Sequence, residues 1–191
     1  MGESSIVERG KEWEREISMS IFATLATGEY LTPFYERVLK SIPKKFVFSN
    51  PLNGLTHAAT VVYLPMFVRI FVQARLGGKY DNLNPRAQID RLMGDELFSR
   101  LHNSHINSLE SFPFFAAAVL GGLHAGVERS RLCRITTLWV AVRLLYVAAY
   151  LLQTKKTSFV RSLVFLYSLA MSMNLLREAG RKLMLSNVKS E

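Results

Sequence analysis

One stretch decides how the rest of the chain is arranged: residues 100–115, RLHNSHINSLESFPFF, which lead directly into the apolar AAAVLGGLHAG of residues 116–126. On a helix, five of its residues recur at alternating spacings of three and four and share one face: Arg100, Asn103, Asn107, Glu110 and Phe114. Polar groups at membrane depth are costly and are tolerated mainly where they face a bundle interior or a water-filled cavity. The stretch therefore predicts a helix whose polar face is turned toward other helices.

The apolar residues are concentrated in four runs, although the average composition is not extreme. The chain has 191 residues, 49% of them hydrophobic and 20% charged, with a mean hydropathy of +0.14. Each run approaches the roughly 20 residues that a helix needs to cross a bilayer. Spans are expected over residues 55–76, 95–127, 133–153 and 158–177. The short connections favour antiparallel neighbours, so the predicted fold is all-α: an integral membrane up-down four-helix bundle.

Residues 1–50 differ in composition and are predicted to form a partly helical N-terminal extension to a four-helix domain over residues 51–191. Helical patterns cover residues 6–26 and 33–42, and the second begins at Pro33 and stops at Pro43. Two interpretations remain open. An apolar stripe within residues 13–25 lies on the membrane or on the bundle, or the extension is solvated and only loosely packed.

The net charge of +9 and the pI near 9.9 are typical of proteins with acidic partners. No compact block of Lys and Arg interleaved with aromatic residues is present, so we expect no nucleic acid. The basic residues instead flank the apolar runs, where anionic lipid headgroups or an acidic ligand would lie. Cys133 is the only cysteine and the four histidines lack metal-binding spacings with carboxylates, so no metal site is expected.

Several arginines are predicted at membrane depth, against one glutamate. The residues that could converge there are Arg75, Arg100, Arg143, Arg161, Asn107, Glu110, Tyr146 and Tyr150. One interpretation is that these side chains pair with one another and hold the bundle together. The excess of positive charge favours the alternative, in which a bound polyanionic ligand supplies the missing negative charges.

Four blocks of the sequence resemble the MAPEG family (membrane-associated proteins in eicosanoid and glutathione metabolism), in particular its microsomal glutathione transferase-like members. Residues 100–115 are similar to the family signature R-x6-N-x2-E-x2-P-x-F, and residues 143–162 are similar to its R-x2-Y-x3-Y…R-S block. Residues 81–86 resemble its DNxxPR loop, and residues 73–75 resemble its Q-x-R at the end of the first helix. The blocks come in the family's order and cover about residues 55–178.

The resemblance implies a homotrimer of four-helix subunits that binds glutathione between neighbours, near the cytosolic face. The implied glutathione-binding residues are Arg75, Arg100, Asn107, Glu110, Arg143, Tyr146 and Tyr150. Arg161, with Ser162 beside it, would be catalytic and lie near the sulfur. A free thiol has a pKa of about 8.5, and a guanidinium or hydroxyl donor aimed at the sulfur favours the more nucleophilic thiolate.

The leading hypothesis is a membrane glutathione transferase or peroxidase that acts on hydrophobic electrophiles or lipid hydroperoxides, in lipid metabolism or detoxification. The alternative is a non-catalytic lipid-binding or scaffold member of the family, and a third is an unrelated four-helix membrane subunit. Asn103 and Ile106 favour the alternative. The glutathione-using eicosanoid enzymes of the family carry an arginine at the position of Asn103, and one of them also carries an arginine at the position of Ile106. We expect a multi-pass protein of the endoplasmic reticulum or another internal membrane.

Overall fold

The computed structural model describes residues 32–77, 80–154 and 156–188. Its elements are helix α2 (Thr32–Ser41), the short 3-10 helix η1 (Lys44–Phe46), α3 (Pro51–Gly77), α4 (Pro85–Leu92), α5 (Glu96–His124), α6 (Arg129–Leu152) and α7 (Ser158–Val188). No strand occurs among these residues, and α3, α5, α6 and α7 are long and apolar enough to cross a membrane. The predicted all-α fold with four membrane-spanning helices is therefore confirmed.

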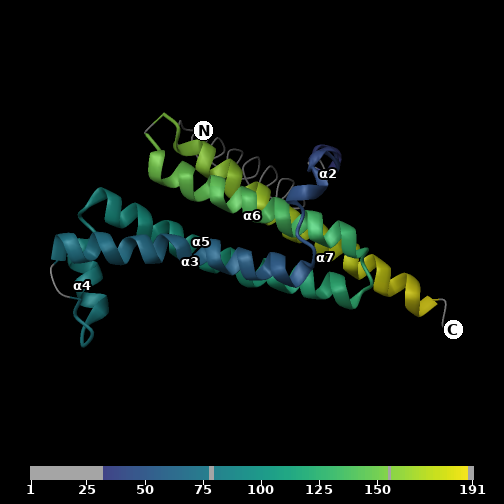
Figure 1. The fold of residues 1–191 in the computed structure, drawn as a ribbon, viewed down its shortest axis with the longest axis horizontal. Helices are drawn as coiled ribbons and strands as arrows, with labels where there is room; N and C mark the ends of the chain where they lie inside the picture. The colour runs from purple at the N-terminus through teal and green to yellow at the C-terminus, as the bar shows by residue number, and fades with distance from the viewer. Residues whose placement is uncertain (1–31, 78–79, 155, 189–191) are drawn as a thin grey trace, which may run out of the picture.

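The four long helices form an antiparallel bundle in which α3 lies beside α5, and α6 beside α7 (Figure 1). A tight hairpin joins α5 to α6, where Gly126 adopts a φ of +68° and Val127 N donates to Gly122 O at 2.8 Å. At the other end of the bundle, the connection between α3 and α5 contains α4, which projects away from the long helices (Figure 1). The start of α5, the end of α6 and the start of α7 consequently share that end.

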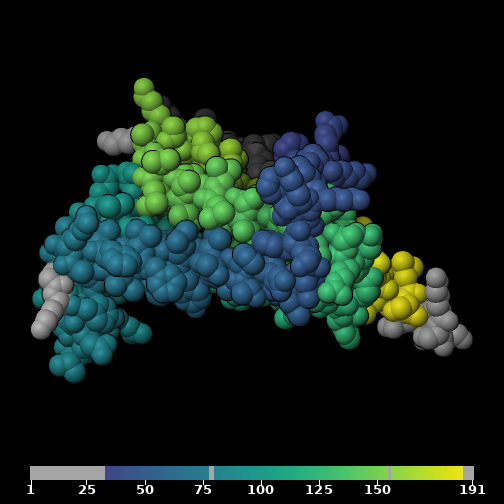
Figure 2. Space-filling model, in the orientation of Figure 1, coloured from purple at the N-terminus to yellow at the C-terminus, as the bar shows by residue number. Residues whose placement is uncertain are grey.

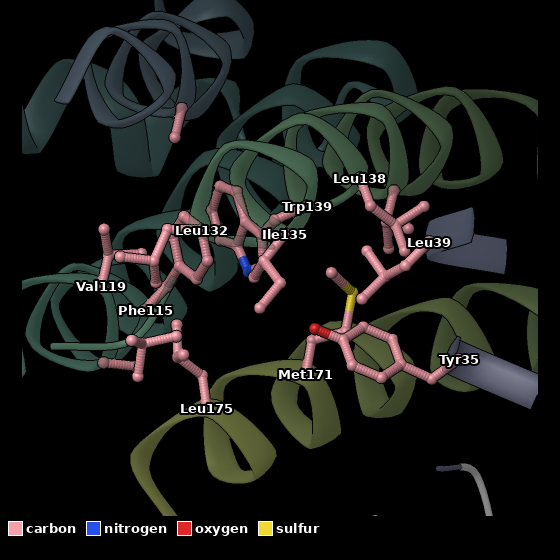
Figure 3. Packing of buried hydrophobic residues seen from close by; sticks show 14 of the residues in the cluster. Tyr35, Leu39, Phe115, Val119, Leu132, Ile135, Leu138, Trp139, Met171 and Leu175 are labelled. Carbon is pink, nitrogen blue, oxygen red and sulfur yellow. The ribbon is translucent and has the colours of Figure 1, made fainter. Parts of the chain in front are cut away.

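The core is centred on α6. Trp139 is fully buried and stacks on Phe115 of α5, with ring centroids 4.2 Å apart and ring planes inclined by 3° (Figure 3). Met171 and Leu175 bring α7 into the same cluster. A buried aromatic pair contributes about 0.5–1.5 kcal/mol beyond its area burial, so this stack fixes how α5 lies against α6.

Helix α2 is docked firmly onto the bundle. Tyr35 and Leu39 are 2% exposed and belong to the core cluster. Arg131 of α6 donates to both carboxylate oxygens of Glu36, at 2.9 and 2.6 Å. Arg134 donates to the carbonyl of Leu39 in the last turn of α2 and to the carbonyl of Ile42 just after it, both at 3.0 Å, and so caps the end of this helix.

Figure 2 shows α2 seated on the surface of the bundle. The helix expected over residues 33–42 corresponds to α2, and its residues Tyr35 and Leu39 pack into the core of the bundle. The helical pattern over residues 6–26 and its apolar stripe lie outside the described residues.

The buried face of α5 is not the predicted polar stripe. Arg100, Asn103, Asn107 and Phe114 are only half-buried, and Glu110 is exposed. The buried polar residues of this helix are Ser104, His105, Ser108 and Ser111. Each of these three serine hydroxyls donates to a carbonyl of its own helix, at 2.7–3.1 Å. A small side chain that satisfies its hydroxyl locally can pack closely against a neighbouring helix, whereas a charged side chain cannot.

Candidate functional site

A cavity of about 280 Å³ opens between α5, α6 and α7, near the end of the bundle where α6 stops and α7 begins. Its lining residues are Asn107, Tyr146, Tyr150, Arg161, Ser162, Phe165 and Leu166. The first five of these were expected at the site from the sequence. The sequence analysis missed Phe165 and Leu166, although Phe165 follows Arg161 and Leu166 follows Ser162 by about one helical turn, on the same side of α7.

Two tyrosines of α6 form one wall of this cavity, which we call the polar cavity. Tyr146 is 2% exposed, and its hydroxyl oxygen accepts a 3.0 Å hydrogen bond from the Asn107 amide nitrogen. Tyr150 is one turn further along and meets Tyr146 edge to face, with ring centroids 5.8 Å apart. The arrangement fixes both rings and joins the polar face of α5 to α6.

Arg161 provides the cation of the polar cavity. Its Nη1 donates to Gln153 Oε1 at 3.1 Å, and its guanidinium lies 4.7 Å from the centroid of the Tyr150 ring. Within the described ranges, no carboxylate forms an ion pair with it. A guanidinium has five N–H donors, so Arg161 has donor capacity left for an anionic ligand.

Arg143 lies behind the wall rather than in the cavity. It is completely buried, with its guanidinium 4.2 Å from the centroid of the Tyr146 ring. Its Nη2 donates to Ser108 Oγ at 2.8 Å, and its Nη1 donates to Ser168 Oγ at 3.3 Å. Arg143 therefore connects α5, α6 and α7 through neutral partners and supports Tyr146 from behind.

The remaining predicted site residues do not line the polar cavity. Arg100 pairs with Glu96 and donates to the carbonyl of Leu151 at 2.6 Å, so it ties the start of α5 to the end of α6. Arg75 and Glu110 are exposed on the surface of the single chain. The expected convergence of four arginines on one site does not occur within the single chain, because the helices place them on different faces.

Comparison with known protein families identifies the family of this chain. The model of the MAPEG family matches residues 54–180, about two thirds of the chain. The chain belongs to the MAPEG family. The match begins after α2 and η1, within the first turn of α3, and ends within α7, so it includes α5 and α6 and most of α3 and α7. No curated protein and no solved structure matched the chain.

Membership of the MAPEG family, together with four helices able to cross a bilayer, makes this an integral membrane protein. It also places the chain among membrane proteins of glutathione and eicosanoid metabolism.

Two of the MAPEG-like sequence blocks have a structural role around α4. The carboxylate of Asp81 accepts hydrogen bonds from the backbone nitrogens of Leu83 and Asn84, both at 3.0 Å, and so shapes the loop before Pro85 begins α4. The buried amide of Gln73 donates to Gln88 Oε1 at 2.7 Å. These blocks therefore hold α4 against the end of α3, whereas the polar cavity is formed by the other two blocks.

Proposed function

We propose that this MAPEG protein binds glutathione in the polar cavity and activates its thiol for attack on hydrophobic electrophiles or lipid hydroperoxides. The observation that carries the proposal is Arg161, a cavity-lining guanidinium whose only side-chain hydrogen bond in the described chain goes to the neutral amide of Gln153. An anionic ligand would complete its environment, because charge-assisted hydrogen bonds are roughly twice as strong as neutral ones.

The donors of the cavity suit a small anionic peptide. Asn107 offers amide groups, Tyr146 and Tyr150 offer aromatic faces and hydroxyls, and Arg161 offers a planar fork of N–H groups. Glutathione supplies the thiol nucleophile. Arg161 and Ser162 would donate hydrogen bonds to the sulfur and favour its ionised form, and each unit by which the thiol pKa falls corresponds to about 1.4 kcal/mol.

A second copy of the chain would complete the site. Glu110 is exposed on a membrane-spanning helix, and Ile106 beside it is 38% exposed. A carboxylate facing lipid is costly, and an interface between subunits would remove that cost. We propose a homotrimer in which Arg75 and Glu110 face a neighbour's polar cavity, with the protein in the endoplasmic reticulum or another internal membrane and the cavity near the cytosol.

The non-catalytic alternative has its own supporting observation. An apolar cavity of about 450 Å³ lies between α2, α6 and α7, and its wall includes Phe34, Val38, Leu138 and Val142. Such a surface would hold an acyl chain, and this function requires no catalytic residue. A family member that only binds lipid would use this cavity and leave Arg161 without a catalytic role.

The experiment that separates the two functions uses the full-length protein purified in detergent. Calorimetry would measure glutathione binding, and absorbance would follow glutathione-dependent consumption of chlorodinitrobenzene. We expect saturable binding, and loss of turnover in Arg161→Ala with unfolding temperature preserved. Arg91→Ala, which removes an exposed arginine of α4, is the matched control and should turn over normally. Absence of glutathione binding at millimolar concentration would leave the lipid-binding alternative.

A further inference from the structure

A second polar cavity lies at the opposite end of the bundle, between α2, the start of α6 and the C-terminal half of α7. Its volume is about 520 Å³. We call it the basic cavity because its charged lining consists of four cations and two carboxylates: Arg131, Arg177, Arg181, Lys182, Glu36 and Glu178. The proposed glutathione chemistry uses none of these residues.

Both carboxylates of the basic cavity are engaged by one arginine. Arg131 donates to Glu36 at 2.9 and 2.6 Å and to Glu178 at 2.8 Å. The other three cations all lie on α7, so the lining residues that the structure describes carry a net positive charge. Lys182 donates to the carbonyl of Gly126 at 3.0 Å, which holds α7 against the hairpin between α5 and α6.

A buried hydroxyl adds a second, independent sign of a ligand. Tyr35 lines the basic cavity and is 2% exposed, yet its hydroxyl has no hydrogen-bond partner in the described part of the chain. A buried polar group without a partner costs about 1–3 kcal/mol. Figure 3 shows this side chain extending from α2 into the bundle toward Met171. Burial raises the pKa of Tyr35 above its ordinary value, so the hydroxyl remains a donor at neutral pH.

The position of the basic cavity indicates what kind of anion it would meet. It lies where the membrane-spanning helices end, and the apolar Leu185 on its rim is 64% exposed. Tyr35 and Glu36 precede the MAPEG match and Arg181 and Lys182 follow it, so much of the wall is outside the matched region. Cationic donors beside an apolar rim at a membrane surface suit a phosphate group attached to lipid.

We propose that the basic cavity binds a phosphate-bearing anion, through Arg181 and Lys182 of α7 and the hydroxyl of Tyr35. The phosphate could belong to an anionic phospholipid headgroup or be free in solution, and two probes distinguish these sources. Calorimetry on the full-length protein in a neutral detergent would measure binding of dioctanoyl phosphatidic acid and, separately, of inorganic phosphate. Saturable binding of phosphatidic acid alone identifies a lipid headgroup, and competition by inorganic phosphate shows that the phosphate group suffices.

Two variants and two controls locate the binding. Arg181→Gln should weaken binding roughly tenfold, the loss expected for one charge-assisted hydrogen bond. Tyr35→Phe should weaken binding several-fold without lowering the unfolding temperature of the ligand-free protein, because the hydroxyl has no hydrogen-bond partner among the described residues. Arg37→Gln on the exposed face of α2 and Arg91→Gln on α4 should bind normally. The proposal is overturned if neither probe binds, or if these controls weaken binding as much as Arg181→Gln does.

Discussion

The amide nitrogen of Asn107 lies 3.0 Å from the hydroxyl oxygen of Tyr146, and this hydrogen bond joins the polar face of α5 to α6 at the wall of the polar cavity. Arg143 packs against the other side of the same tyrosine ring. Tyr146 is therefore held by a neutral hydrogen bond and by a cation from behind. A ligand that enters the cavity would meet a preformed surface, because buried partners already fix the position of the ring.

Tyr146→Phe tests the importance of this hydrogen bond. The substitution keeps the ring but leaves the Asn107 amide without its partner, so we expect a loss of about 1 kcal/mol in the free energy of unfolding. Glutathione should also bind more weakly, because the cavity loses the Tyr146 hydroxyl and the Asn107 amide is no longer held in position. Thermal unfolding and calorimetry in detergent measure the two effects. Tyr80→Phe, at an exposed position after α3, is the control, and an unchanged glutathione affinity in Tyr146→Phe would contradict the placement of the site.

Two substitutions of Arg143 distinguish how much its volume and its charge each contribute to the stability of the protein. Arg143→Ala would leave a hole beneath Tyr146, and large-to-small changes of this kind cost about 2–5 kcal/mol. Arg143→Met keeps much of the volume. Its serine partners Ser108 and Ser168 retain their hydrogen bonds to carbonyls of their own helices. We therefore expect Arg143→Met to unfold at a clearly higher temperature than Arg143→Ala. Equal losses in the two variants would mean that the guanidinium itself is indispensable to the fold.

The docking of α2 should depend on pH through Glu36. The hydrogen bond from Arg131 lowers the pKa of this carboxyl below its ordinary value of about 4.3. A lowered folded-state pKa stabilises the protein above the unfolded-state pKa, and this stabilisation is lost as pH falls through the folded-state pKa. The difference in unfolding temperature between wild type and Glu36→Gln should thus be constant near neutral pH and shrink below about pH 4. A difference independent of pH would show that the carboxylate charge plays no part in docking.

Substitution by alanine should have opposite effects on stability at two glycines, one in a close contact between α3 and α6 and one in an open position on α7. A Cβ atom added at Gly54 would overlap the side chain of Thr136, whereas one added at Gly180 meets no atom within 4 Å. Gly54→Ala should destabilise the protein by about 1–3 kcal/mol through overpacking. Gly180→Ala should stabilise it by roughly 0.5–1 kcal/mol, because alanine is the better helix former. Thermal unfolding of both variants tests this, and a Gly54→Ala protein as stable as wild type would show that the helices can separate at this point.

Much of the bundle was predictable because hydropathy and segment length are local properties of the sequence. Asn107, Tyr146, Tyr150 and Arg161 were expected to converge because they are polar residues at membrane depth, and the resemblance to the MAPEG family added Ser162. All five line the polar cavity. Hydropathy and segment length did not predict which face of α5 is buried. Serine hydroxyls that bond within their helix look as polar in a sequence as residues that need a partner. The polar stripe that begins at Arg100 was therefore expected on the buried face, which the serines occupy instead.

The place of α2 has no local signal at all. Its docking depends on Arg131 and Arg134, which lie more than 90 residues further along the chain. Only the folded bundle brings these side chains to Glu36 and to the end of α2. The burial of Arg143 among neutral partners was likewise unpredictable, because an arginine at membrane depth is expected to form an ion pair with a carboxylate.

The most direct test of the central claim is the ionisation of glutathione bound to the purified protein, followed by the ultraviolet absorbance of the thiolate as pH is varied. We expect saturable glutathione binding and a thiolate that appears at pH values well below the free thiol's pKa of about 8.5. In Arg161→Ala this shift should be lost while the protein remains folded. Absence of saturable binding at millimolar glutathione, or a bound thiol that ionises like the free one, would contradict the account.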